Sequence, residues 1–196
     1  MIFDLITIAV VGAMLVFAGY TALQFLGRFP RRTIEHVTPY LRPAEFEELE
    51  SLLNPAHEVN FRLHLSPQEF RAWQRKRIHL MREYLLRMSH NSLVLIEWGN
   101  LELSGEAARL PSSKQTTLLA QELVQAATEF RLYSLLALAK LKLWIIFRMD
   151  ASASLPRLRN VFGIDSLGAY HRLKSAASAL GLTHGDEYHQ ALLNRL

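Results

Sequence analysis

The sequence contains no cysteine. That absence excludes a disulfide framework, a thiolate metal site and a cysteine nucleophile. The chain also lacks a G-x-S-x-G element, a P-loop and a Rossmann fingerprint, the motifs of acyl transfer, phosphate binding and dinucleotide binding. We therefore expect no cofactor and no enzymatic activity, and an enzyme with an unrecognised site is the remaining alternative. No motif is specific enough to indicate a family.

Charged side chains are absent from residues 5–26, which read LITIAVVGAMLVFAGYTALQFL. A helix crosses about 30 Å of hydrocarbon with about 20 mainly apolar residues, so this run is long enough. A cleaved signal peptide would begin with basic residues and have an apolar core of about 7–15 residues. This chain instead begins MIFD, and the poor cleavage site GRFP follows the run. We predict an uncleaved transmembrane anchor over 1–27; a cleaved signal and a buried core helix are the alternatives.

Basic residues stand directly after this run, at Arg28, Arg31 and Arg32, whereas none precedes it. Lys and Arg close to a membrane span stay on the cytoplasmic side. The predicted topology is single-pass, in a plasma or inner membrane, with the N-terminus outside and the C-terminal domain in the cytoplasm. The lipid bilayer is therefore the first expected partner.

Beyond the anchor, the composition predicts a juxtamembrane linker over 28–42 and a helical cytoplasmic domain over 43–196. The linker is expected to be irregular because it contains Pro30 and Pro39. The domain is long enough to bury one hydrophobic core. The whole chain has a formal net charge of +4, a mild basic excess.

The start of the domain shows three local patterns. A short helix is expected over 43–53, ended by Asn54-Pro55. Residues 56–65 alternate apolar and polar side chains, which predicts a strand or an extended segment lying on helices. The letters SPQE at 66–69 then form a capping box with proline at the first helical position, so a long helix should begin there.

Helical periodicity dominates the rest and predicts an all-α fold, in which a single transmembrane helix is followed by a helical bundle. Two long helices, from 66 to about 103 and from 114 to 149, are joined by a short loop, so we expect an antiparallel hairpin. Lys140 and Lys142 argue against a second membrane span, because charge near the bilayer centre is costly; a re-entrant or surface-lying helix is the alternative. The remaining expected elements are a loop at 150–164 and helices at 166–180, stopped by Gly181, and 184–195.

Basic residues gather in one stretch of the first long helix, where only Glu83 opposes them. Among them, Arg77 points away from the side that Arg71, Arg75 and Arg82 share. Such a face attracts anionic phosphate, so anionic lipid is a possible partner and nucleic acid a less favoured one. The simpler interpretation is a solvated face, partly paired with the acidic residues of the preceding short helix. The candidate anionic-surface site consists of Arg71, Arg75, Lys76, Arg82 and Arg87.

Two C-terminal patterns give weaker signals. Residues 166–195 have the spacing of a helix-turn-helix, but Asp186 and Glu187 would repel phosphate at the start of a recognition helix, so a packed helix pair is expected. His184 and His189 are five residues apart and cannot easily share an ion on a helix, so they are expected to be solvent-exposed polar residues and no metal site is expected.

Glu97, Trp98 and Asn100 interrupt an otherwise apolar half of the first long helix. A buried glutamate there would be of functional interest. A rim position at the tip of the hairpin is the favoured interpretation.

These observations favour a membrane-anchored protein-interaction or scaffolding module, with a protein partner or a second copy of itself at the cytoplasmic membrane face. Binding of anionic lipid or nucleic acid through the basic helix face at 71–87 is the alternative function.

Overall fold

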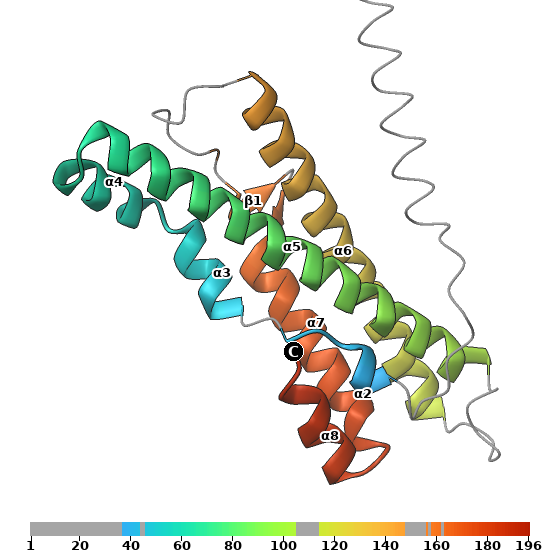
Figure 1. The fold of residues 1–196 in the computed structure, drawn as a ribbon. Coiled ribbons are helices and arrows are strands. Elements are labelled where there is room, and N and C mark those ends of the chain that lie inside the picture. The colour runs from blue at the N-terminus through green and yellow to red at the C-terminus, as the bar shows by residue number, and fades with distance from the viewer. Residues whose placement is uncertain (1–36, 44–45, 105–113, 148–155, 157, 162) are drawn as a thin grey trace, which may run out of the picture. The chain divides into compact units, whose positions relative to one another are not determined.

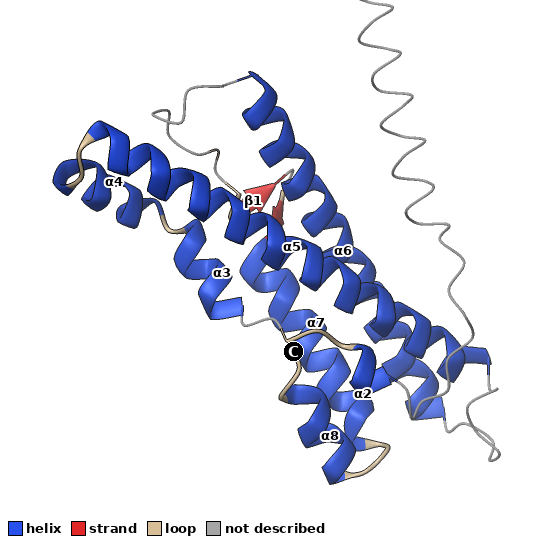
Figure 2. Cartoon of the chain, in the orientation of Figure 1, coloured by secondary structure: helices blue, strands red, loops and turns tan. Residues whose placement is uncertain are grey.

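Helices make up most of the structure, a computed structural model that describes residues 37–43, 46–104, 114–147, 156, 158–161 and 163–196 (Figures 1 and 2). The prediction of a helical bundle is confirmed for this part of the chain. The elements are α2 (Val37–Tyr40), α3 (Phe46–Leu53), α4 (Pro55–His64), α5 (Pro67–Ser104), α6 (Lys114–Phe147), β1 (Asn160–Val161), β2 (Ile164–Asp165), α7 (Ser166–Leu182) and α8 (Asp186–Leu193).

The predicted anchor and the three arginines that follow it lie outside the described residues. Among the helices that are described, none is both long and apolar enough to cross a membrane. The single-pass topology therefore stays a prediction.

The long helix α5 begins where the capping box predicts. The Ser66 backbone N–H donates to Glu69 Oε2 over 3.0 Å, and the Ser66 hydroxyl donates to the same oxygen over 2.6 Å. The Glu69 N–H approaches Ser66 Oγ at 3.4 Å. These contacts satisfy backbone donors that the first helical turn leaves without partners.

The predicted antiparallel pairing of the two long helices is confirmed, because α6 returns along α5 (Figure 1). Gly99 lets the two helices approach closely: a Cβ atom at this position would lie 2.5 Å from Val124 Cγ2 and 3.1 Å from the Ala120 carbonyl oxygen. The hydrophobic core lies between α5, α6 and α7. Its largest fully buried side chains include Trp98, Met81, Leu85 and Leu95 of α5, Leu123, Phe130, Tyr133 and Leu141 of α6, and Leu173 and Leu180 of α7.

The prediction of a strand or an extended segment at 56–65 is wrong, since residues 56–64 belong to helix α4 and Leu65 follows it as the C-cap. Asn54 caps the helix by accepting a hydrogen bond from the Ala56 N–H over 2.9 Å, and Pro55 occupies the first turn. The same two residues therefore end α3 and start α4. The apolar side of α4 is only partly used: the Phe61 ring packs against Trp73, while Leu63 is 78% exposed.

The segment at 150–164, predicted to be a loop, contains a short strand pair in its described part. Strands β1 and β2 pair antiparallel, with Val161 opposite Ile164. Gly163 permits the tight turn between them, with φ of 84° in the left-handed region. The buried Tyr133 hydroxyl donates to the Leu158 carbonyl oxygen over 2.8 Å and so fastens this segment to α6.

Helices α7 and α8 pack against each other, as predicted. Helix α7 continues through Gly181 to Leu182, so glycine does not stop it as predicted. A Cβ atom at Gly181 would lie 3.2 Å from Leu192 of α8, which shows how closely the two helices approach.

Residues 37–42 belong to the bundle, whereas the sequence predicted an irregular linker there. Val37 and Leu41 are buried. The Asn91 side chain holds this segment on α5, because it accepts a hydrogen bond from the Arg42 N–H over 2.8 Å and donates to the Arg42 carbonyl over 2.7 Å.

Replacing Gly99 with Val should destabilise the protein by about 1–3 kcal/mol relative to Asn100→Val, because only the first substitution inserts atoms into the contact between α5 and α6. The neighbouring Asn100 is exposed, so the same new side chain meets solvent there. Urea unfolding of the full chain in mild detergent, followed by circular dichroism, measures the difference. Equal midpoints for the two variants would contradict the close contact.

Alkaline pH should unfold the protein because burial raises the pKa of Tyr133, Tyr170 and Tyr188 to about 12, from an ordinary value of 10.0. A pKa that is higher in the folded state means that the neutral phenols stabilise the fold fully below pH 10, and that this contribution is lost as the pH rises towards 12. Each tyrosine should account for about 2–3 kcal/mol. Tyrosinate absorbance against pH, with circular dichroism in parallel, tests this expectation; tyrosines that all ionise near pH 10 in a folded protein would refute it.

Candidate functional site

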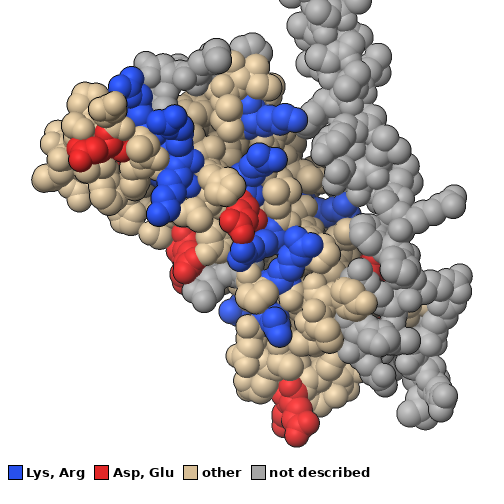
Figure 3. All heavy atoms as spheres, in the orientation of Figure 1, with Lys and Arg blue, Asp and Glu red and all other residues tan. Residues whose placement is uncertain are grey.

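Four of the five predicted anionic-surface residues lie exposed on the first half of α5: Arg71, Arg75, Lys76 and Arg82. They form no ion pair within the described residues. Arg87 differs, since it is partly exposed and forms an ion pair with Glu83 one turn earlier. Figure 3 shows Lys and Arg side chains spread over α5 and α6 on one face of the molecule, with few acidic side chains among them.

The sequence predicted that acidic residues of α3 pair with this basic face. Glu50 of α3 does not pair with it. Its carboxylate lies 3.8 Å from the Arg159 guanidinium, which comes from the segment before β1. The cationic side of α5 is therefore turned to solvent rather than to α3.

Arg77 is the one basic residue of the cluster that turns inward, and only 4% of its side chain is exposed. Its guanidinium donates to Glu58 Oε2 over 3.0 Å, to the Leu52 carbonyl over 2.8 Å and to the Asn54 carbonyl over 3.2 Å. Burial lowers the pKa of Arg77, and the nearby charge of Glu58 acts in the opposite direction. The helical period indicated that Arg77 points elsewhere, but not which groups would receive it.

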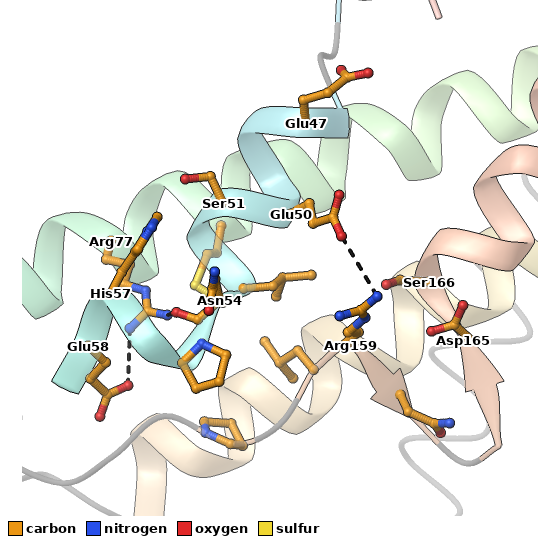
Figure 4. A pocket seen from close by; sticks show the side chains of 16 residues that line it. Glu47, Glu50, Ser51, Asn54, His57, Glu58, Arg77, Arg159, Asp165 and Ser166 are labelled. Carbon is orange, nitrogen blue, oxygen red and sulfur yellow. Dashed lines mark hydrogen bonds and ion pairs between the residues drawn. The ribbon is translucent and has the colours of Figure 1, made fainter. Parts of the chain in front are cut away.

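A cleft of about 680 Å³ lies beside Arg77, between α3, α4 and the segment before α7 (Figure 4). Its volume is typical of a small-molecule site. Several charged side chains of its wall already serve the fold, however: Arg77 binds Glu58, Arg159 lies close to Glu50, and Asp165 caps α7 by accepting from the Gly168 N–H over 2.8 Å. The lining residues are Glu47, Glu50, Ser51, Leu53, Asn54, Pro55, His57, Glu58, Arg77, Met81, Pro156, Leu158, Arg159, Asn160, Asp165 and Ser166.

A second polar cluster centres on Glu102 near the end of α5, where only 3% of its side chain is exposed. Trp98 Nε1 donates to Glu102 Oε1 over 3.0 Å, and His184 Nε2 lies 3.0 Å from the same oxygen. The Tyr188 ring stands edge-on to Trp98, with 5.7 Å between centroids. These contacts fasten α8 and the turn before it to α5. The expectation of a solvent-exposed His184 is wrong, because its Nε2 is inaccessible to solvent and lies beside the Glu102 carboxylate.

No group of three metal-ligating side chains occurs among the residues that the structure describes. His189 lies against Gly181, with its Nδ1 3.7 Å from the position that a Cβ atom would take there.

The predicted rim position of Glu97 and Trp98 is wrong. Trp98 is fully buried, and the carboxylate oxygens of Glu97 are inaccessible to solvent. Burial lowers the pKa of Arg131 of α6 below its ordinary value. The negative charge of Glu97 acts on Arg131 in the opposite direction and offsets part of this effect. Of the three residues, only Asn100 is exposed. The site of interest predicted for Glu97 is thus an internal charge pair of the hairpin.

Comparisons with protein-family models, with curated proteins and with solved structures find no match. The candidate sites are therefore distinguished by their geometry alone. The cleft beside Arg77 and the cluster at Glu102 are built from side chains that hold helices together, whereas the basic side of α5 makes no such contacts.

Replacing Glu58 with Gln should destabilise the protein by about 3 kcal/mol, because it leaves the buried Arg77 charge without its counter-charge. Glu83→Gln is the matched control: it breaks the exposed pair of Glu83 with Arg87 within α5 and should cost less than about 1 kcal/mol. The double variant Glu58→Gln/Arg77→Met removes both charges and should recover much of the loss. Urea unfolding measures all three, and equal losses for Glu58→Gln and Glu83→Gln would refute the buried pair.

Proposed function

We propose that this protein is a single-pass, membrane-anchored helical module that presents an interaction surface at the cytoplasmic membrane face. The observation that carries the proposal is the order of features along the chain. An uncharged run over 5–26 is followed by Arg28, Arg31 and Arg32, and then, after a few residues, by a bundle of helices. A hydrophobic run of this length is typical of a membrane span, and the basic residues after it are typical of a cytoplasmic flank.

The character of the bundle supports an interaction role. Within the described residues, the polar groups that are buried together serve helix packing, as Arg77 with Glu58 and Glu102 with His184 do. The surface, in contrast, exposes large apolar side chains on α4 and α6, and such groups on a soluble body are common at sites of association. These are Val59, Phe61 and Leu63 on α4 and Leu118, Leu132, Leu143, Ile145 and Ile146 on α6.

The competing functions have weaker support. Acidic residues begin α8 at Asp186 and Glu187, where a recognition helix would meet phosphate. An enzymatic role requires an assembled catalytic group, and in the described cleft Arg77 and Arg159 are paired with Glu58 and Glu50 while Asp165 caps α7.

The protein should sediment with membranes and resist alkaline extraction, and deletion of residues 1–27 should release it, because the proposed anchor supplies its hold on the bilayer. A reporter fused after Leu196 should be active only in the cytoplasm. Replacing Arg28, Arg31 and Arg32 with Gln should produce molecules of mixed orientation, because the charges that set the topology are lost.

Removal of the full chain from membranes by alkaline carbonate would overturn the anchor. The interaction role is tested separately by crosslinking in intact membranes, followed by capture of the protein. Recovery of the protein alone, together with a monomer in mild detergent, would refute a protein partner and a second copy alike.

A further inference from the structure

One side of α5 combines exposed cations with an exposed apolar residue. Arg71, Arg75 and Arg82 fall within about 40° of one another at about 100° per residue. All three are exposed and form no ion pair within the described residues. Leu86 lies one turn beyond Arg82 on the same side and is 47% exposed. The surface of this helix half is therefore both cationic and partly apolar.

The C-terminal end of α6 also exposes both apolar and basic side chains, but here the apolar ones predominate. Leu143 is 54% exposed and Ile146 is 58% exposed, and their separation of three residues places them on one side. Lys142 is also exposed and lies one turn before Ile146. A lysine can lay its stem along apolar surface while its ammonium stays among polar groups. Exposed leucine and isoleucine beside lysine are typical of helices that lie in a membrane interface.

These two surfaces lie at the same end of the hairpin. Because α6 runs antiparallel to α5, the last turns of α6 and the first turns of α5 point toward the same end of the hairpin, where the two helices diverge (Figure 1). Figure 3 shows basic side chains over both helices on one face, with few acidic ones among them. A flat anionic surface could therefore meet cations from both helices at once.

The proposed anchor over 1–27 would hold the bundle near the bilayer. The uncharged run ends at Leu26 and the first described helix begins at Val37. The positions between them, 27–36, reach at most about 35 Å even when fully extended. The cytoplasmic leaflet is rich in anionic lipid, which attracts juxtamembrane Lys and Arg.

We propose that the cationic side of α5 and the apolar end of α6 lie on anionic lipid headgroups of the membrane that holds the anchor. Arg71, Arg75 and Arg82 bind lipid phosphates, while Leu143 and Ile146 enter the boundary between headgroups and acyl chains. The inference rests on the proposed anchor and adds a second membrane contact. A second copy is a poorer occupant, because a symmetric interface would place these arginines opposite like charges.

Spin labelling tests this proposal directly, because the chain contains no cysteine and each introduced cysteine is the only one. The full chain is reconstituted in nanodiscs of phosphatidylcholine alone or of phosphatidylcholine with phosphatidylglycerol. Leu143→Cys carries the reporting label, and Leu182→Cys, at an exposed position at the end of α7, carries the control label. Accessibility to oxygen against a water-soluble nickel chelate measures the depth of each label.

The label at Leu143 should move into the lipid only in the anionic discs and should return to water at high salt, where screening weakens the attraction. The label at Leu182 should stay in water throughout. Arg71→Gln/Arg75→Gln/Arg82→Gln should lower the ratio of docked to undocked molecules on the order of 100-fold, since each basic residue near an anionic leaflet changes it about fivefold.

The matched control removes the same number of charges elsewhere, with Arg159→Gln/Arg172→Gln/Arg195→Gln, and should leave the label at Leu143 in lipid. An equal loss in the control would overturn the proposal, since net charge alone would then explain the binding. Circular dichroism checks that both triple variants keep their helix content.

Two further results would overturn the lipid contact while leaving the anchor intact. The first is a Leu143 label that stays in water in both lipids although the chain is held in the disc. The second is a disulfide-linked dimer through Leu143→Cys, which would assign the surface to a second copy. A chain that is not retained in the discs would refute the anchor itself, and the second contact with it.

Discussion

The division of α5 into a buried side and a cationic side is the constraint on which the rest of the structure depends. Met81, Leu85 and Leu95 must leave water together, and this fixes the rotation of the helix against α6. Most of the basic residues between 71 and 87 then face solvent. Arg77 falls on the buried side, where an unpaired charge is costly. The carbonyl ends of α3 and the carboxylate of Glu58 receive it, so one side chain determines where three helices meet.

Much of this fold could be predicted from the sequence where local signals and burial agree. Ser66 and Glu69 form the contacts that their spacing indicates, and the periodicity of the two long helices gives their pairing. The prediction failed at 56–65 because alternation of apolar residues does not require burial on one face of a strand. Val59 and Leu63 are largely exposed, so most of the alternation there reflects no packing, and the Asn54-Pro55 cap is the stronger signal. Strands of two residues, as in β1 and β2, are too short to leave a pattern at all.

Only part of the candidate surface could be predicted from the sequence. Four exposed basic residues on α5 follow from composition and helical period. The partner of Arg77, the burial of Glu97 against Arg131 and the contact between Glu102 and His184 depend on helices that meet only in the folded chain. Sequence spacing cannot reveal such pairs, because their members stand tens of residues apart. The sequence left a packed bundle helix and a surface-lying helix both open for the end of α6, because helical periodicity does not show which apolar side chains are covered in the fold.

A short tether to the membrane strengthens the effect of a surface that binds lipid only weakly. Three exposed arginines free in solution would hold a membrane only transiently, because each contributes about 1 kcal/mol near an anionic leaflet. A proposed anchor at 5–26 makes the same contact intramolecular, so its strength is set by the effective concentration that the residues between 26 and 37 impose. The docked state then needs only a modest advantage over the free state, and it remains sensitive to lipid charge and to salt. The proposed lipid contact uses no residue of α4, where Val59 and Leu63 are exposed, so a membrane contact and an interaction role draw on different residues of one bundle.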